Sequence, residues 1–218
     1  MLDVVKVMQT LSGERPVFHS EADFQHALAW QIHLQSPKSR IRLEYPLSVD
    51  YEELGHLDLM LFEEDREVAF ELKYKKARFF APLQREIFLL KADSAQDIGR
   101  YDFLRDVQRL EKAISERRNA GGYAILLTND SLYWEPSPRE TISDSFRLTK
   151  GRNITGALSW TAKAGKGTTK GKDLPISLKG MYECVWRDYS YIALGEYTKG
   201  NGEFKYLMFT VTKTENLP

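Results

Sequence analysis

The strongest structural signal in the chain comes from two apolar stretches, GHLDLMLF at residues 55–62 and EVAFELKY at residues 67–74. Each has the length and the aliphatic and aromatic content of a β-strand. The polar turn at residues 63–66 separates them, so we expect an antiparallel hairpin. Each stretch also carries charge: Asp58 lies near the start of the first, and Glu71 and Lys73 lie on the second.

These three charged residues need a physical explanation, because burying a charge in an apolar strand is costly unless a partner compensates it. Glu71 and Lys73 are two residues apart and therefore share one face of their strand. Two carboxylates brought together by strand pairing, with a lysine beside them, are what a metal-dependent phosphodiesterase needs. The simpler alternative is that Lys73 pairs with Glu71 or Asp58 in an exposed cross-strand salt bridge.

The sequence on both sides of this hairpin predicts an α/β protein with a central mixed sheet flanked by helices. Helices are expected at residues 2–11 and from residue 20 to the Ser-Pro pair at 36–37, the second capped by Ser20. A strand is expected at 41–47 and a long amphipathic helix at about 95–118, ended by residues 119–122. The apolar run at 123–128 predicts a strand buried on both faces, reached through a parallel crossover.

The C-terminal part of the chain has a different pattern. Residues 135–180 are rich in Gly, Ser, Thr and Lys and read as loops, and strand signals return at 181–186, 189–194 and 204–211. We therefore divide the chain into a core at residues 1–130 and a loop-rich, β-rich extension at residues 131–218. The extension is expected to pack on the core or to pair at the edge of its sheet.

Composition limits the class of protein. The 218 residues are 42% hydrophobic and 28% charged, as in an ordinary globular protein. A formal charge of zero disfavours a histone-like polyanion binder, although local charge decides contact with nucleic acid. No apolar run approaches the ~20 residues of a membrane span, so no membrane partner is expected. The single cysteine, Cys184, excludes an internal disulfide framework and suits a cytoplasmic location.

The order of elements, with Asp58 on one strand and Glu71-x-Lys73 on the next, resembles the PD-(D/E)XK nuclease superfamily. This is the fold of restriction endonucleases, Holliday-junction resolvases and many repair or phage-defence nucleases. The resemblance covers residues 19–130 and includes the lead-in Gly55-x-x-Asp58. Glu21, early in its helix, falls where many members carry a helical glutamate.

Two features depart from the family pattern. No proline precedes Asp58, although one is frequent across the superfamily. Gln96 and Tyr101 are five residues apart, whereas members that act with helicases place a Gln and a Tyr four apart on the following helix.

The resemblance implies a restriction-endonuclease-like, Mg²⁺- or Mn²⁺-dependent nuclease that hydrolyses DNA phosphodiester bonds. Its expected catalytic residues are Asp58, Glu71, Lys73 and Glu21. The metal ligands would be Asp58, Glu71 and the carbonyl of Leu72, and the metal would polarise the phosphate and lower the pKa of a bound water. Lys73 would orient that water or offset charge that grows on the phosphorane.

Further residues are candidates for the surroundings of the site. His56, Gln96 and Arg100 are its candidate neighbours, although a partly buried, hydrogen-bonded histidine and a solvated helix face are the commoner explanations for such residues. Residues 150–179 carry seven basic side chains against one acidic side chain. Their Gly-rich part is either a loop that contacts phosphates or a solvated loop. If it contacts phosphates, the residues expected to bind nucleic acid are Lys163, Lys166, Lys170 and Lys172.

Several alternatives stay open at this point. The protein could be a non-catalytic nucleic-acid-binding or assembly subunit of a restriction, repair or transposition complex. DNA is the expected partner, and a homodimer or a larger nuclease complex is the expected assembly. His19, His26 and His33 recur every seven residues, for which an amphipathic surface is the default and a zinc site the alternative.

Overall fold

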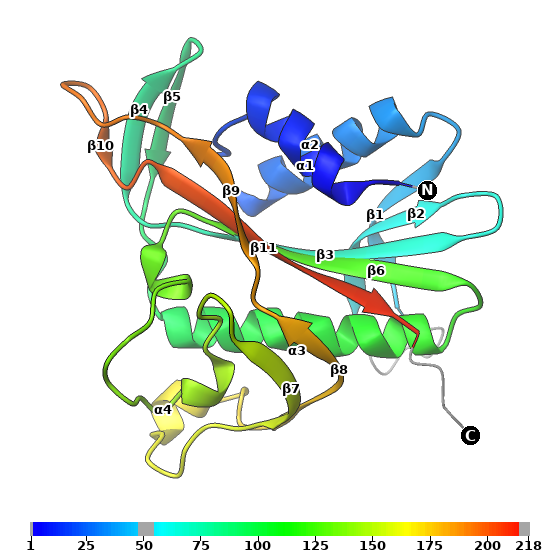
Figure 1. Ribbon diagram of the computed structural model, residues 1–218, viewed down its shortest axis with the longest axis vertical. Coiled ribbons are helices and arrows are strands. Elements are labelled where there is room, and N and C mark those ends of the chain that lie inside the picture. The colour runs from blue at the N-terminus through cyan, green and yellow to red at the C-terminus, as the bar shows by residue number, and fades with distance from the viewer. Residues whose placement is uncertain (1, 48–54, 214–218) are drawn as a thin grey trace.

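The computed structural model describes residues 2–47 and 55–213 of the chain. Its central strands are β1 (Arg40–Pro46), β2 (His56–Phe62), β3 (Glu67–Lys75), β6 (Ala120–Thr128), β9 (Trp186–Tyr191) and β11 (Glu203–Thr212). They form a six-stranded mixed sheet in the order β1–β2–β3–β6–β11–β9 (Figure 1). The predicted α/β class, with a central mixed sheet flanked by helices, is confirmed.

Two N-terminal helices, α1 (Val4–Glu14) and α2 (Glu21–Gln35), cover one face of this sheet (Figure 1). The predicted cap of α2 is present, because the Asp23 N–H donates to Ser20 Oγ at 3.1 Å. Such a bond satisfies one of the backbone donors that every helix N-terminus leaves free. Helix α1 begins two residues later than expected and runs three residues further.

The predicted hairpin is confirmed, since β2 and β3 pair antiparallel from Leu59 opposite Phe70 to Phe62 opposite Glu67. The predicted parallel crossover is also confirmed. Strand β3 leads through the long helix α3 (Gln96–Ser115) to β6, which pairs parallel to β3.

The pair Gly121–Gly122 was expected to end the long helix, and this was wrong, because both glycines lie in β6. A Cβ at Gly122 would lie 2.8 Å from the Ala69 carbonyl oxygen and 2.9 Å from the side chains of Leu110 and Ile114. Glycine therefore allows α3 to lie close against the sheet.

A hairpin that the sequence analysis did not assign follows β3. It consists of β4 (Phe79–Leu83) and β5 (Glu86–Leu90), and it forms a small sheet with β10 (Lys199–Gly200) at the end of the central sheet (Figure 1). Phe88 and Leu90 are buried whereas Ile87 and Leu89 are exposed. Buried and exposed residues therefore alternate along β5. Because the exposed ones are also apolar, the sequence lacks the alternation of apolar and polar residues that predicts a strand.

The C-terminal strands are part of the central sheet. Strand β11 pairs antiparallel with β6 along its length, and β9 pairs with β11. These strands therefore show the second of the two expected arrangements, pairing at the edge of the sheet, whereas β7 and β8 pack on the core.

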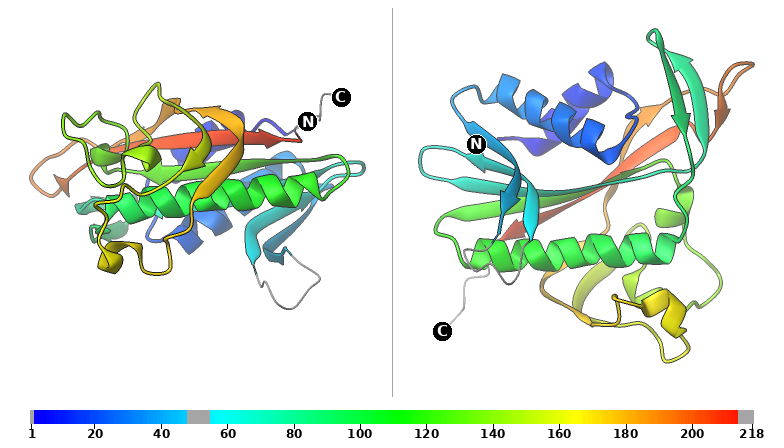
Figure 2. Two further views of the ribbon diagram at one scale, coloured as in Figure 1. Left: turned by 90° about the horizontal axis from the view of Figure 1, so that it is seen from below. Right: turned by 180° about the vertical axis from the view of Figure 1, so that it is seen from behind.

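The region 135–180 is less irregular than expected. It contains β7 (Asn153–Leu158), which pairs with β8 (Ile176–Glu183), and the short helices η2 (Asp144–Phe146) and α4 (Lys166–Thr169), and another short helix, η1 (Ser131–Tyr133), precedes it. The β7–β8 pair lies beside α3, on the face of the sheet opposite α1 and α2 (Figure 2). Glu111 of α3 holds it there. Its carboxylate accepts hydrogen bonds of 2.7–3.0 Å from the backbone N–H groups of Lys179 and Gly180 and from the Tyr182 hydroxyl.

The sheet separates two hydrophobic cores. Phe70, Leu72 and Tyr74 of β3 belong to the core under α1 and α2, whereas Ala69 belongs to the core under α3. The alternation of a strand therefore directs Glu71 and Lys73 toward α3. In the described ranges, no helix has the length and apolar character to span a bilayer.

Candidate functional site

Two of the predicted acids lie at an open edge of β3. Strand β2 pairs with β3 only as far as Leu59 and Phe70, while β3 continues to Lys75. The Leu72 N–H on this edge donates to Asp58 Oδ2 at 2.5 Å, and the Tyr74 N–H donates to Glu21 Oε2 at 2.8 Å. A buried backbone donor without a partner is costly, so these bonds position both carboxylates.

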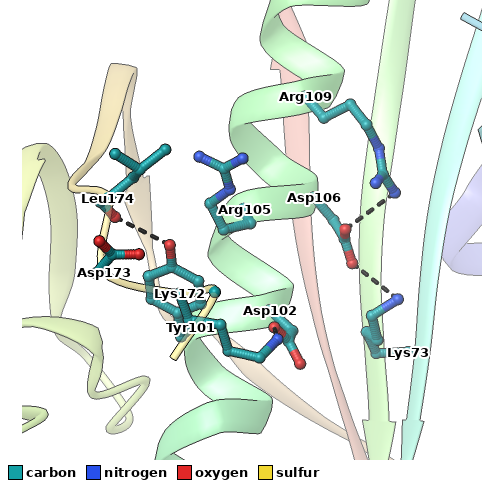
Figure 3. Close-up of a pocket in the computed structure, with 10 residues that line it drawn as sticks. Lys73, Tyr101, Asp102, Arg105, Asp106, Arg109, Lys172, Asp173 and Leu174 are labelled. Carbon is teal, nitrogen blue, oxygen red and sulfur yellow. Dashed lines mark hydrogen bonds and ion pairs between the residues drawn. The ribbon is translucent and has the colours of Figure 1, made fainter. Parts of the chain in front are cut away.

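The other two predicted residues meet helix α3. Glu71 is 1% exposed and accepts two hydrogen bonds from Arg109, from Nε at 2.8 Å and from Nη2 at 2.7 Å. Arg109 Nη2 also lies 2.9 Å from Asp106 Oδ1. Lys73 Nζ lies 2.8 Å from Asp106 Oδ2 and 3.8 Å from Glu21 Oε1. Figure 3 shows Asp106 between the two cationic side chains.

These contacts contradict the simpler alternative of an exposed cross-strand pair. The Lys73 side chain is only 17% exposed, and its closest carboxylate belongs to Asp106 of α3. The closest cation to Glu71 is Arg109. The charges are therefore joined between a strand and a helix, in a partly desolvated space.

The group carries more negative than positive charge. Its described members are four carboxylates and two cations, which leaves a formal excess of two negative charges: Glu21, Asp58, Glu71 and Asp106 around Lys73 and Arg109.

This balance, together with burial, shifts the pKa values of the site. Burial raises the pKa of Asp58 to about 6, with Asp106 and Glu21 adding to the rise and the Leu72 N–H and Lys73 opposing it. Burial also raises the pKa of Glu71, although its two bonds to Arg109 act in the opposite direction. Burial lowers the pKa of Lys73, but the nearby carboxylates outweigh it and raise this pKa overall. A further cation would therefore stabilise the ionised acids.

The donor atoms at the edge of β3 suit a hard divalent cation. Mg²⁺ and Mn²⁺ prefer oxygen ligands, and the carboxylates of Asp58 and Glu71 provide them. The N–H and C=O of one strand residue point to the same edge, so the Leu72 carbonyl opens toward Asp58. Lys73 Nζ donates to this carbonyl at 3.3 Å.

The protein alone does not complete a ligand set. Among residues 2–47 and 55–213, no group of three or more His, Cys, Asp or Glu side chains is arranged to hold a metal ion. Two carboxylates and a carbonyl would leave the remaining positions to water or to substrate oxygens, as is usual for Mg²⁺. The zinc alternative finds no support in the same ranges, where His19 stacks on Phe88 and contacts Glu86.

A cavity of about 530 Å³ opens beside this group of charges. Its wall on the side of the sheet consists of Lys73, Asp106 and Arg109. Its wall on the other side of α3 consists of residues 171–174, which include Lys172 (Figure 3). Arg105 of α3 also lines it. The cavity therefore joins the acidic group to the basic segment of the chain.

The four candidate nucleic-acid ligands differ in their positions. Lys172 lines the cavity, forms an ion pair with Asp102 and lies over the Tyr101 ring. The other three are exposed on and around α4: Lys163, Lys166 and Lys170.

The structure places two of the three predicted neighbours, Gln96 and Arg100, away from the site. His56 is exposed at the start of β2, opposite Pro46. Gln96 donates to Asp130 at 2.9 Å, and Arg100 donates to the carbonyl of Leu132 at 2.5 Å. Gln96 lies ten residues before Asp106 on the same helix, a separation of ~15 Å at 1.5 Å per residue.

Sequence reasoning missed Asp106 and Arg109. Asp106 lies three residues after Phe103 and four before Leu110, both of which are buried. An acid inside the apolar stripe of a helix is a signal, and an arginine three residues later shares its face.

Gly55 has a packing role next to this helix. A Cβ at this position would lie 3.2 Å from Leu47 Cδ1 and 3.7 Å from Arg109 Cδ. The approach to Leu47 is tight, whereas 3.7 Å is an ordinary van der Waals contact, so the glycine in the Gly55-x-x-Asp58 lead-in makes room for Leu47.

Comparisons with protein-family models, with curated proteins and with solved structures found no match to this chain. Its function is therefore inferred from the fold and from the residues gathered at the edge of β3.

Proposed function

We propose that the protein is a restriction-endonuclease-like nuclease that uses Mg²⁺ or Mn²⁺ to hydrolyse DNA phosphodiester bonds. The observation that carries this proposal is the open edge of β3. There, Asp58, Glu71 and the Leu72 carbonyl lie beside Lys73 and next to a cavity lined by both basic and acidic side chains. This combination supports metal-dependent phosphodiester chemistry better than a structural ion-pair cluster, which has no need of a cavity.

Each residue has a role that follows from its position. Asp58, Glu71 and the Leu72 carbonyl would hold the metal, which would activate a water and polarise the phosphate when bound. Glu21 is held by the Tyr74 N–H and lies 3.8 Å from Lys73, so it positions the lysine and adds negative charge for a cation.

Lys73 acts as a cation in this proposal. The surrounding carboxylates raise its pKa, so it remains protonated near neutral pH and cannot accept a proton from water. A protonated lysine at the wall of the cavity would stabilise negative charge that develops on the phosphate.

The cavity would hold the substrate backbone. Its basic side chains are Lys73, Arg105, Arg109 and Lys172, and its acidic ones are Asp102, Asp106 and Asp173. Contacts of this kind position a nucleic acid without reading its sequence.

The test is a cleavage assay on plasmid DNA and labelled oligonucleotides with Mg²⁺, with Mn²⁺ and with a chelator. We expect metal-dependent cleavage that falls by about 10²-fold or more in each variant, because Asp58→Ala removes a metal ligand and Lys73→Ala removes the cation that would stabilise charge on the phosphate. Asp188→Ala is the matched control, since Asp188 is an exposed acid on β9 that pairs with Lys205. Cleavage that survives Asp58→Ala and Lys73→Ala would refute this assignment.

One observation favours a second function, that of a non-catalytic nucleic-acid-binding or assembly subunit of a restriction, repair or transposition complex. Both oxygens of Glu71 are bound by Arg109, so the pair would stabilise the fold without any metal. This alternative predicts that the protein binds DNA without a metal and does not cleave it. Asp58→Ala should then leave DNA binding unchanged.

A further inference from the structure

The contact between Glu71 and Arg109 is a two-bond pair between a buried acid and a half-exposed base. Glu71 is 1% exposed and the Arg109 side chain 37%. Nε and Nη2 of the guanidinium each bind one carboxylate oxygen, at 2.8 and 2.7 Å. This parallel geometry is the strongest that an arginine and a carboxylate form.

A metal ion on Glu71 would compete with this pair. The guanidinium uses both carboxylate oxygens, and its positive charge would lie within a few ångströms of a divalent cation bound to them. Two cations at such a distance repel each other, most strongly where water is excluded. Each carboxylate oxygen has a second lone pair, but the repulsion between the cations favours the loss of at least one Arg109 bond when Glu71 ligates a metal.

Arg109 has a second position available without a change of helix. Its Nη2 already lies 2.9 Å from Asp106 Oδ1, so Asp106 can retain the guanidinium when Glu71 releases it. The side chain also lines the 530 Å³ cavity, together with Arg105 and Lys172. Figure 3 shows the Arg109 side chain reaching from α3 toward Asp106.

We propose that Arg109 is the resident counter-ion of the metal-free site, an inference that rests on the metal-dependent function proposed above. It occupies the place of a cation on Glu71 until a divalent ion binds. It then pivots on Asp106 into the cavity and contacts a phosphate of the DNA. One side chain thereby keeps the empty site folded and couples metal binding to substrate binding.

The first test measures metal affinity directly. Mg²⁺ is titrated calorimetrically into the full-length protein, Arg109→Ala and Arg109→Gln, at about pH 9 so that Glu71 stays ionised without its partner. Both variants should bind Mg²⁺ about tenfold more tightly than the wild type, because the competing charge is gone. Arg109→Gln retains an amide donor for Glu71 and guards against a variant that does not fold. Arg105→Ala, which lines the same cavity, should leave Mg²⁺ affinity unchanged.

The second test measures DNA binding with and without metal. Affinity for a mixed-sequence duplex oligonucleotide is determined with Ca²⁺, which also binds oxygen ligands, and with a chelator. With Ca²⁺, Arg109→Gln should weaken binding about fivefold and reduce the slope of log affinity against log salt by about one. With the chelator, Arg109→Gln should have no effect, because Arg109 is then engaged with Glu71. Arg105→Ala should weaken binding equally in both conditions.

The outcomes separate this inference from the proposed function. Tighter Mg²⁺ binding by the Arg109 variants, with a loss of DNA affinity seen only with metal, supports the inference. Unchanged or weaker Mg²⁺ binding overturns it and leaves the metal site standing. A loss of DNA affinity that is the same with and without Ca²⁺ also overturns it. Absence of Mg²⁺ binding in the wild type and in both Arg109 variants overturns the metal site and the inference together.

Discussion

Asp58 shows at the scale of one residue how structural and chemical roles combine. Its carboxylate accepts a hydrogen bond from the Leu72 N–H where β2 and β3 separate. The nearby carboxylates of Asp106 and Glu21 disfavour its ionised form. Because burial raises the pKa of Asp58 to about 6, the metal-free fold favours the protonated acid. A metal would reverse that preference.

This shift predicts a pH dependence of stability. The pKa of Asp58 is raised in the folded state, so its contribution stabilises the protein below about pH 4 and is lost as the pH rises through about 6. The free energy of unfolding of the metal-free protein should lose about 3 kcal/mol over this range from Asp58 alone. Urea unfolding at several pH values measures it. Asp58→Asn, whose amide oxygen still accepts the Leu72 N–H, should show a flatter profile, and identical profiles would contradict the assignment.

At the scale of elements, helix α3 organises the site and the packing around it. It approaches β6 closely over Gly122, directs Asp106 and Arg109 at β3, and holds the β7–β8 pair through Glu111. One helix therefore connects the sheet, the acidic group and the C-terminal region.

The close approach of α3 and β6 gives a test of packing. Gly122→Ala should lower the free energy of unfolding by about 1–3 kcal/mol, because its Cβ would press against the side chains of Leu110 and Ile114 at 2.9 Å. Gly13→Ala is the control: it lies in α1 with nothing within 4 Å of the added carbon. That change should raise stability by up to about 1 kcal/mol through helix propensity. Thermal unfolding of both variants checks the expected difference in sign.

The contacts of Glu111 predict a local effect. Glu111→Ala leaves the N–H groups of Lys179 and Gly180 and the Tyr182 hydroxyl without their acceptor, at about 1–3 kcal/mol for the buried Tyr182 hydroxyl and less for the two more exposed N–H groups. Hydrogen exchange should accelerate at residues 176–183 while β3 and β6 stay protected. Glu116→Ala, just past the end of α3, should change neither. Uniform acceleration across the sheet would show instead that Glu111 supports the whole fold.

At the scale of the whole molecule, the two ends of the chain share one sheet. Residues 131–218 contribute β9 and β11, and β11 covers the side of β6 that β3 leaves open. Leu207, Phe209 and Val211 are buried in the core under α3. Residues 1–130 therefore lack both a strand and part of a core.

A fragment of residues 1–130 should not fold by itself. Its β6 would have an unpaired edge next to exposed apolar surface, which favours aggregation over a native sheet. Circular dichroism and amide spectra of the fragment should lack a cooperative unfolding transition. Co-expression with residues 131–218 should restore it, and a fragment that folds alone would establish an independent core.

Local patterns of the sequence determined much of this protein. The β2–β3 hairpin, the Ser20 cap, the long helix, the buried strand at 123–128 and the shared face of Glu71 and Lys73 all follow from neighbouring residues and short periods. These features extend over a few residues, so turn chemistry and side-chain period are enough to predict them.

Only the tertiary structure decided which distant residues complete the sheet and the site. The pairing of β11 with β6, the contact of Arg109 with Glu71 and of Lys73 with Asp106, and the cavity shared with Lys172 join segments far apart in the chain. Helix register decides that Asp106 and Arg109 face β3 while Gln96 and Arg100 contact residues 130–132. That register depends on how closely α3 packs against the sheet, and packing is a property of both surfaces together.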